Sequence, residues 1–233
     1  MAATPSTDQA FLREVDEELR REQLMTFWRR WGRWIVVAVI VGLIGLAAGL
    51  WWRQHQAEQA GADGEKLAAA YKALAVNKPD EAQKMLTALA GSSASGVRAL
   101  ARFTQADILL QKKDLKGAAA KFAEVANEES YAQAFRDLAL LRQTATEYDS
   151  LKPQTVVDRL QGMAVKDSPW FGSAGEMVAV AYLRMGKRDA AGKLFGEIGQ
   201  AEGVPASIRQ RAVQMAGVLG VDAVNQSEEK NAR

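Results

Sequence analysis

The stretch AVAYLRMGKRDAAGKLFGEI, residues 179–198, contains the pattern on which the fold rests. Its key positions are a small residue, an aromatic residue, a turn glycine, and a second small and a second aromatic residue: Ala179, Tyr182, Gly186, Ala191 and Phe195. Apolar residues three and four positions apart lie on one face of a helix, and glycine is common where a helix ends. The stretch therefore predicts two helices joined by a tight turn and packed together through their small side chains.

The same pattern recurs along the chain. Each second helix of a pair carries a small or β-branched residue followed four and seven positions later by larger apolar ones: Ala82, Leu86 and Leu89; Ala118, Phe122 and Val125; Val156, Leu160 and Met163; Ala191, Phe195 and Ile198. The starting residues are 36, 38 and 35 positions apart. Small residues lie 12 positions before three of them, at Ala70, Ala106 and Ala179, whereas the third unit has Thr144 there. The spacing is close to the ~34-residue period of a tetratricopeptide repeat.

Breaks between the helical segments are expected at seven places: Asn77-Lys78-Pro79, Gly91-Ser92-Ser93, Lys112-Lys113-Asp114, Lys152-Pro153, Asp167-Ser168-Pro169, Gly186-Lys187-Arg188 and Gly203-Val204-Pro205. A helix pair leaves one apolar face uncovered, so neighbouring pairs must stack. Residues 65–220 are therefore expected to form an all-α, tetratricopeptide-like solenoid of about four helix pairs, closed by a capping helix from Pro205 to Leu219. Residues 221–233 lack an apolar pattern and are expected to form a flexible tail.

Upstream of this domain, residues 34–52, WIVVAVIVGLIGLAAGLWW, run for 19 positions without a charged side chain. A helix of that length spans about 28 Å, close to the hydrocarbon thickness of a bilayer. Tryptophans, which favour the headgroup region, stand at both ends: Trp28, Trp31 and Trp34, then Trp51 and Trp52. The sequence therefore predicts one transmembrane helix in a lipid bilayer.

The basic residues around this span predict its orientation. The 14 residues before it hold five arginines, whereas the 14 residues after it hold only Arg53 and Lys66. Because Lys and Arg concentrate on the cytoplasmic side, residues 1–33 are expected in the cytoplasm and the C-terminal domain across the membrane. An uncleaved anchor is favoured over a signal peptide, whose apolar core is shorter.

The segments flanking the span are predicted to differ. Within residues 1–33, Ser6 and Gln9 have the spacing of a capping box that opens a helix. The amphipathic pattern that follows fits a helix lying on the membrane, or a docking helix for a partner. Residues 53–64 are polar and are expected to form a linker.

Four small residues share one face of the predicted span: Ala38, Gly42, Gly45 and Gly49. Such a face lets another helix approach closely, although glycine is also common in membrane helices. The face is therefore a candidate for helix packing in the membrane.

The composition leaves few catalytic options. The chain has no cysteine and one histidine, His55, next to the span, so Cys nucleophiles, His-based triads and Cys/His zinc sites are excluded. Glu128 and Glu129 point about 100° apart if they lie on a helix, and are interpreted as solvated charges. We expect no enzyme, no metal and no cofactor, and the net charge of +2 gives no indication of nucleic acid as a partner.

Binding is the activity that remains. The first helices of such pairs line the inner face of the stack, and the register places five apolar residues there: Leu100, Phe103, Leu110, Val180 and Leu183. Leu138, Leu141 and Tyr148 hold similar positions in the third unit. Core packing explains most residues of this kind, and any that are exposed form an apolar groove for a polypeptide.

Two N-terminal motifs, DQAFLREVDEELRREQ (Asp8–Gln23) and FWRRWGRW (Phe27–Trp34), precede the span and the helix pairs. This combination resembles the YfgM type, the ancillary subunit of the bacterial Sec translocon, over nearly the whole chain. The resemblance implies a bacterial inner-membrane protein whose periplasmic domain associates with the Sec translocon and a membrane-anchored periplasmic chaperone, and assists exported polypeptides. The alternative is a scaffold for envelope biogenesis, in outer-membrane assembly or cell division.

Overall fold

The computed structural model describes the backbone of residues 7–223 and the side chains of residue 25 and residues 28–223. The regular elements of the described backbone are all α-helices: α1 (Thr7–Ala75), α2 (Pro79–Leu89), α3 (Ser95–Gln111), α4 (Leu115–Ala126), α5 (Gln133–Glu147), α6 (Pro153–Leu160), α7 (Phe171–Arg184), α8 (Arg188–Gln200) and α9 (Ala206–Val218). The chain divides into two compact units, Met1–Gln59 and Ala60–Arg233. The all-α prediction is confirmed.

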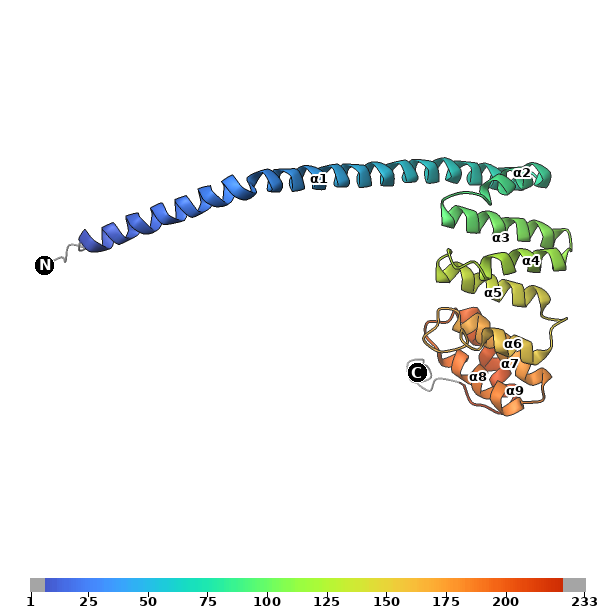
Figure 1. Ribbon diagram of the computed structural model, residues 1–233. Coiled ribbons are helices and arrows are strands. Elements are labelled where there is room, and N and C mark those ends of the chain that lie inside the picture. Colours follow the sequence, from blue (N-terminus) through green and yellow to red (C-terminus); the bar gives the residue numbers. More distant parts are fainter. Residues whose placement is uncertain (1–6, 224–233) are drawn as a thin grey trace, which may run out of the picture. The chain divides into compact units, whose positions relative to one another are not determined.

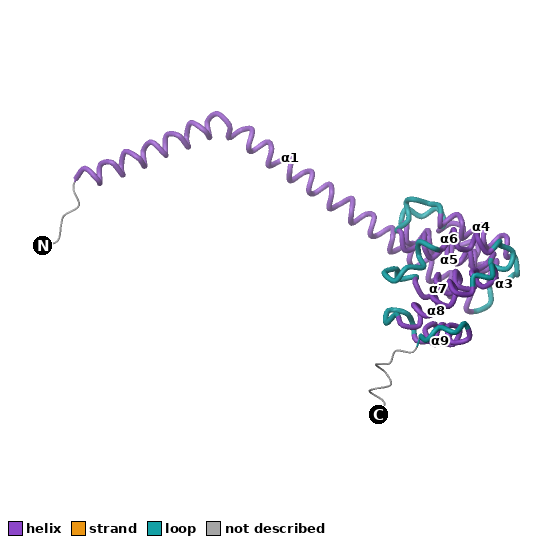
Figure 2. Tube along the Cα trace, turned by 90° about the horizontal axis from the view of Figure 1, so that it is seen from below, coloured by secondary structure: helices purple, strands orange, loops and turns teal. Residues whose placement is uncertain are grey.

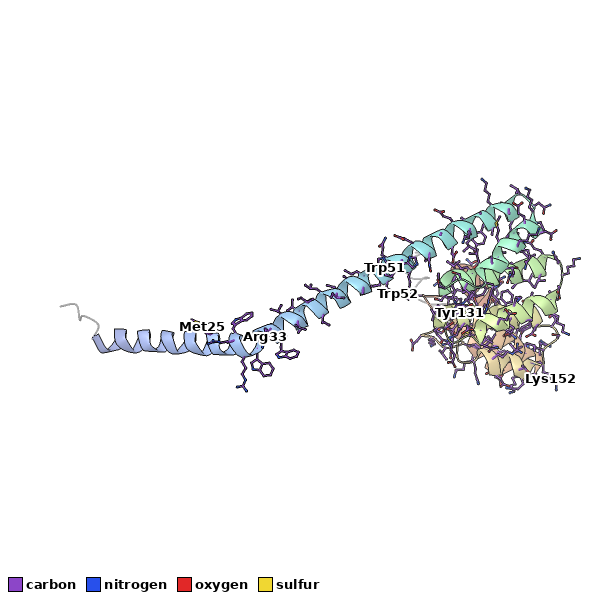
Figure 3. The ribbon with its side chains drawn as sticks, turned by 45° about the horizontal axis from the view of Figure 1, so that its top comes forward. Met25, Arg33, Trp51, Trp52, Tyr131 and Lys152 are labelled. Atoms are coloured by element: carbon purple, nitrogen blue, oxygen red, sulfur yellow. The ribbon has the colours of Figure 1, made fainter. Side chains whose placement is uncertain are left out.

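The first unit consists of the N-terminal part of α1, which runs as one uninterrupted helix (Figure 2). Among the described residues, one helical segment, Trp28–Ala75, is long and apolar enough to cross a membrane, and an 18-residue stretch within it has a mean hydropathy of 2.5. Its tryptophans are exposed, and Figure 3 shows Trp51 and Trp52 projecting from the helix. The Trp51 ring stacks on the ring of His55 at 5.6 Å. Ser6, half of the predicted capping box, lies outside the described residues.

The segment predicted as a linker, residues 53–64, is helical and part of α1. The segment is rich in Gln and Ala, which favour helices, and side chains four positions apart bond to each other. Gln54 donates to Glu58 at 3.0 Å, and Gln59 lies 3.0 Å from His55. The end of α1 therefore also serves as the first helix of the first pair.

The second unit is a stack of helix pairs. The end of α1 shares a hydrophobic cluster with α2. Helix α3 pairs with α4, α5 with α6 and α7 with α8, and each helix from α2 to α9 packs on the next (Figure 1). The core follows the repeat positions. The small residues Ala70, Ala106, Ala179 and Ala191 have no exposed surface, and neither do Ala82, Ala118 and Phe122; Phe195 is 1% exposed. The predicted tetratricopeptide-like solenoid with its capping helix α9 is thus the observed architecture.

The third pair keeps this register despite its different residue. Thr144 is fully buried where the other pairs have alanine, and its hydroxyl donates to the carbonyl of Leu140 at 2.8 Å. A threonine satisfies its hydroxyl in this way without a partner outside its own helix. The polar residue therefore fits a position between helices that otherwise admits only small apolar side chains.

One break was missed by the sequence analysis. Residues 127–132 separate α4 from α5, so Glu128 and Glu129 lie in a turn rather than on a helix. Tyr131, labelled in Figure 3, is buried there beneath the guanidinium groups of Arg98 and Arg102, which lie 5.1 and 5.8 Å from its ring centre. Arg98 also donates to Ser130 at 3.0 Å. Contacts from α3 thus hold a turn that has neither glycine nor proline.

The turns within the first, second and fourth pairs share one backbone conformation. The residues after the first helix, Asn77, Lys113 and Gly186, have φ of 58°, 62° and 74°. The following amides close the same turn by donating to carbonyls five positions earlier: Lys78 to Ala73, Asp114 to Leu109 and Lys187 to Tyr182, each at 2.9 Å. This is the Schellman ending of a helix, in which glycine is the favoured residue.

Lys113 is therefore strained by its side chain, and Lys113→Gly should raise the free energy of unfolding by about 0.5–1 kcal/mol. Gly186→Ala, the reverse change at the equivalent turn, should lower it by about 1 kcal/mol. Urea unfolding of the full chain in detergent, followed by far-UV circular dichroism, measures both. A stabilising Gly186→Ala would contradict the shared turn conformation.

The C-terminal end of the stack is closed more completely than predicted. Val221 and Ala223 pack into the core cluster around Phe195, and Ala223 is only 3% exposed. Glycines on α8 make room for them, since a Cβ on Gly192 would lie 2.9 Å from Val221. The expectation of a flexible tail from residue 221 is therefore wrong for residues 221–223, and residues 224–233 lie outside the described part.

Candidate functional site

A hollow of about 410 Å³ lies between the first helices of the third and fourth pairs, α5 and α7. Its lining residues come from the last turn of α5, the residues that follow it, and the middle of α7: Ala145, Tyr148, Asp149, Glu176, Met177 and Val180. The hollow belongs to the first-helix side of the stack, where the repeat register predicts a binding surface.

Small and anchored side chains produce this space. Ala145 follows the buried Thr144 and has only a methyl group, whereas Asp107 and Val180 occupy the corresponding positions of the second and fourth pairs. The Tyr148 hydroxyl donates to the carbonyl of Met177 at 3.0 Å and so joins the two walls. The hollow is therefore built into the packing of α5 on α7.

Charges around the hollow are unequally compensated. Glu176 accepts two hydrogen bonds from the guanidinium of Arg211 on α9, at 2.8 and 2.7 Å. This contact raises the pKa of Arg211 above its ordinary value. Asp149, by contrast, is exposed and forms no ion pair with any described residue. The rim thus carries one neutralised carboxylate and one available carboxylate.

Tyr148 remains a neutral donor in this setting. Burial raises the pKa of its phenol, an effect that the nearby Arg184 guanidinium opposes. Arg184 lies 5.4 Å from the Tyr148 ring centre and donates to the carbonyls of Tyr148 and Leu151 at 3.0 and 3.1 Å. The phenol therefore keeps its bond to Met177 across the range of ordinary pH.

The predicted groove residues fall into three groups. Leu100 is exposed, at 39%. Leu110, Val180 and Leu183 are partly buried, as is Leu138, and of these only Val180 lines the hollow. Phe103 is 6% exposed and Leu141 9%, so both belong to the core.

Phe103 therefore cannot line a groove as predicted. Its ring lies 5.9 Å from that of Phe122 and 6.5 Å from that of Phe135, centre to centre. The turn missed at residues 127–132 brings α5 back against α3 and α4 and covers Phe103. Phe135 supplies that cover from the first turn of α5.

Four lining residues were not identified from the sequence: Ala145, Asp149, Glu176 and Met177. A groove predicted from large apolar side chains omits them, because these residues are small, acidic or unbranched. Helical spacing could have found them, since Glu176 and Met177 precede Val180 by four and three positions. Ala145 likewise precedes Tyr148 by three positions and Asp149 by four.

Two other predicted sites are less defined. Tyr182 lines a smaller hollow of about 280 Å³ with residues of α8 and the turn after α6. In the span, a Cβ added to Gly42, Gly45 or Gly49 would meet no atom within 4 Å. The glycine face is therefore open in the single chain, and Ala38 is exposed as well.

Comparison with known families agrees with this architecture. The tetratricopeptide repeat-like domain family matches residues 25–216, which include both the apolar stretch and all four helix pairs. The searches of curated proteins and of solved structures gave no match. Because the family match covers well over half of the sequence, the chain belongs to the tetratricopeptide repeat-like domain family.

Proposed function

We propose that this chain is a non-catalytic, membrane-anchored binding protein, an ancillary subunit of the Sec translocon that contacts periplasmic chaperones and exported polypeptides. The observation that carries the proposal is the hollow between α5 and α7, on the first-helix side of a repeat domain that is typically used to bind proteins. Leu100 provides a second exposed apolar position on first helices.

The anchor supports the location. A helix long and apolar enough to cross a membrane precedes the repeats, and the arginines lie mainly on its N-terminal side. This distribution favours a cytoplasmic N-terminus and a periplasmic domain at a bacterial inner membrane. The resemblance of the N-terminal motifs to YfgM-type subunits supports the Sec translocon as the partner.

Attachment to the membrane makes weak binding useful. A binding surface held by a short connection beside its partner acts at an effective concentration around the millimolar range. A shallow site with few fixed contacts can therefore hold emerging chains transiently and release them. In this mechanism the span supplies proximity and the repeat domain supplies contact, and the glycine face is available for a neighbouring membrane helix.

Site-specific photocrosslinking in cells tests this proposal. A photoreactive residue at Val180 or Leu100 should trap exported polypeptides, a channel subunit or a periplasmic chaperone. The same residue at Lys84, exposed on the second helix of the first pair, serves as the control and should trap far less. If none of these partners is trapped, the translocon proposal is wrong, and outer-membrane assembly or division proteins in the same samples would establish the scaffold alternative.

A further inference from the structure

We propose that the α5–α7 hollow selects polypeptide segments in which an apolar side chain lies beside a lysine or arginine. The inference rests on the proposed function, because it names the class of client that the same surface receives. The occupant is an extended segment of an exported polypeptide. Its apolar side chain enters the hollow and its cation reaches the rim.

The apolar half of this preference follows from the walls. Met177 and Val180 on α7 line a space of about 410 Å³ together with Ala145 of α5 and Tyr148, the residue that follows α5. Sites of roughly 300–1,000 Å³ bury small ligands, so this hollow accepts one large side chain with part of its backbone. Methionine adapts its shape to different neighbours, which suits a site that receives many sequences.

The basic half follows from the uncompensated charge. The Glu176 carboxylate is already held by Arg211 through two bonds, so it offers little to a ligand. Arg184 is likewise committed to two backbone carbonyls and to the Tyr148 ring. Asp149 is exposed at the rim and forms no ion pair with a described residue. A ligand cation is its complement, whereas a ligand carboxylate is repelled.

The two contributions should differ in size. An ion pair at an exposed rim is screened by water and salt, so loss of the Asp149 charge should weaken binding only about two- to fivefold. Filling the hollow with a side chain of the protein itself should weaken peptide binding about tenfold or more, because the ligand then has no apolar contact. Charge therefore sets preference, and the hollow provides most of the affinity.

Fluorescence anisotropy with the full-length protein in lipid nanodiscs tests both contributions. The probes are three labelled 12-residue peptides with alternating Leu and Lys, Leu and Glu, or Ser and Lys. The variants are Asp149→Asn and Ala145→Leu. Their matched controls are Asp167→Asn and Ala120→Leu, which make the same changes at exposed positions away from the hollow. Circular dichroism melting establishes that each variant is folded.

We expect the Leu/Lys peptide to bind tightest to the unmodified protein. Asp149→Asn should reduce its preference over Leu/Glu, more so at low salt, and Ala145→Leu should reduce binding of both Leu peptides. A Lys preference that survives Asp149→Asn, or equal effects of Ala145→Leu and Ala120→Leu, would overturn the inference. If either of these results is found but Val180 still crosslinks to exported chains, the proposed function stands. Loss of all crosslinks would refute the function itself.

Discussion

Phe122→Ala is expected to lower the free energy of unfolding by about 3–5 kcal/mol. Phe122 has no exposed surface, its ring packs 5.9 Å from the ring of Phe103, and the guanidinium of Arg142 lies 4.6 Å from its centre. Truncation removes apolar contacts from α3, α4 and α5 together and leaves a cavity. Because single domains are stable by only about 5–15 kcal/mol, this change brings the stack close to unfolding.

Leu115→Ala on the same helix is the matched control. Leu115 is 55% exposed, so its truncation should change the free energy of unfolding by less than about 0.5 kcal/mol. Urea titration of the full chain in detergent, monitored by circular dichroism, compares the two variants. Similar midpoints for both would show that Phe122 does not occupy the core position of its pair.

The second large effect concerns orientation in the membrane. Alkaline phosphatase, which is active only when exported, should be active when fused after Arg233 and inactive when fused after Trp31. The reason is the concentration of Arg20, Arg21, Arg29, Arg30 and Arg33 before the span. The measurement is phosphatase activity in whole cells, normalised to the amount of each fusion protein.

A pair of green fluorescent protein fusions at the same two positions provides the complementary control, since this reporter fluoresces in the cytoplasm. We expect fluorescence only from the fusion after Trp31. The opposite pattern in both reporters would place the repeat domain in the cytoplasm and remove the basis of the proposed function. Substitution of Arg29, Arg30 and Arg33 by Asn should weaken the bias and produce molecules of both orientations.

Local chemistry explains what could be predicted about the helices. Proline or glycine marks most of the breaks, including Pro79, Pro153 and Gly186, and each acts on the backbone of its own neighbours. The break at residues 127–132 has neither residue. Its local signal is confined to the turn-favouring residues Asn127 and Ser130, and Arg98, from another helix, bonds to Ser130 and Tyr131 there.

In the candidate site, too, some residues could be predicted from local spacing and others depend on contacts between helices. Val180 and Tyr148 followed from the repeat register, because the register decides which side of a helix faces inward. Whether an inward residue is covered depends on the size of side chains on the next helix. Ala145 leaves space on α5, and Arg211 from α9 neutralises Glu176, while Asp149 forms no ion pair with a described residue. None of these relations is visible in the spacing of one segment.

By itself, therefore, the sequence determined the apolar span, the helical period and the buried small residues, since these depend on side chains within one or two turns of a helix. The tertiary structure alone decided the burial of Val221 and Ala223 and the hollow between α5 and α7. Each of these depends on contacts between residues far apart in the chain. Such contacts exist only after the pairs have stacked, because stacking is what covers one residue and leaves its neighbour open.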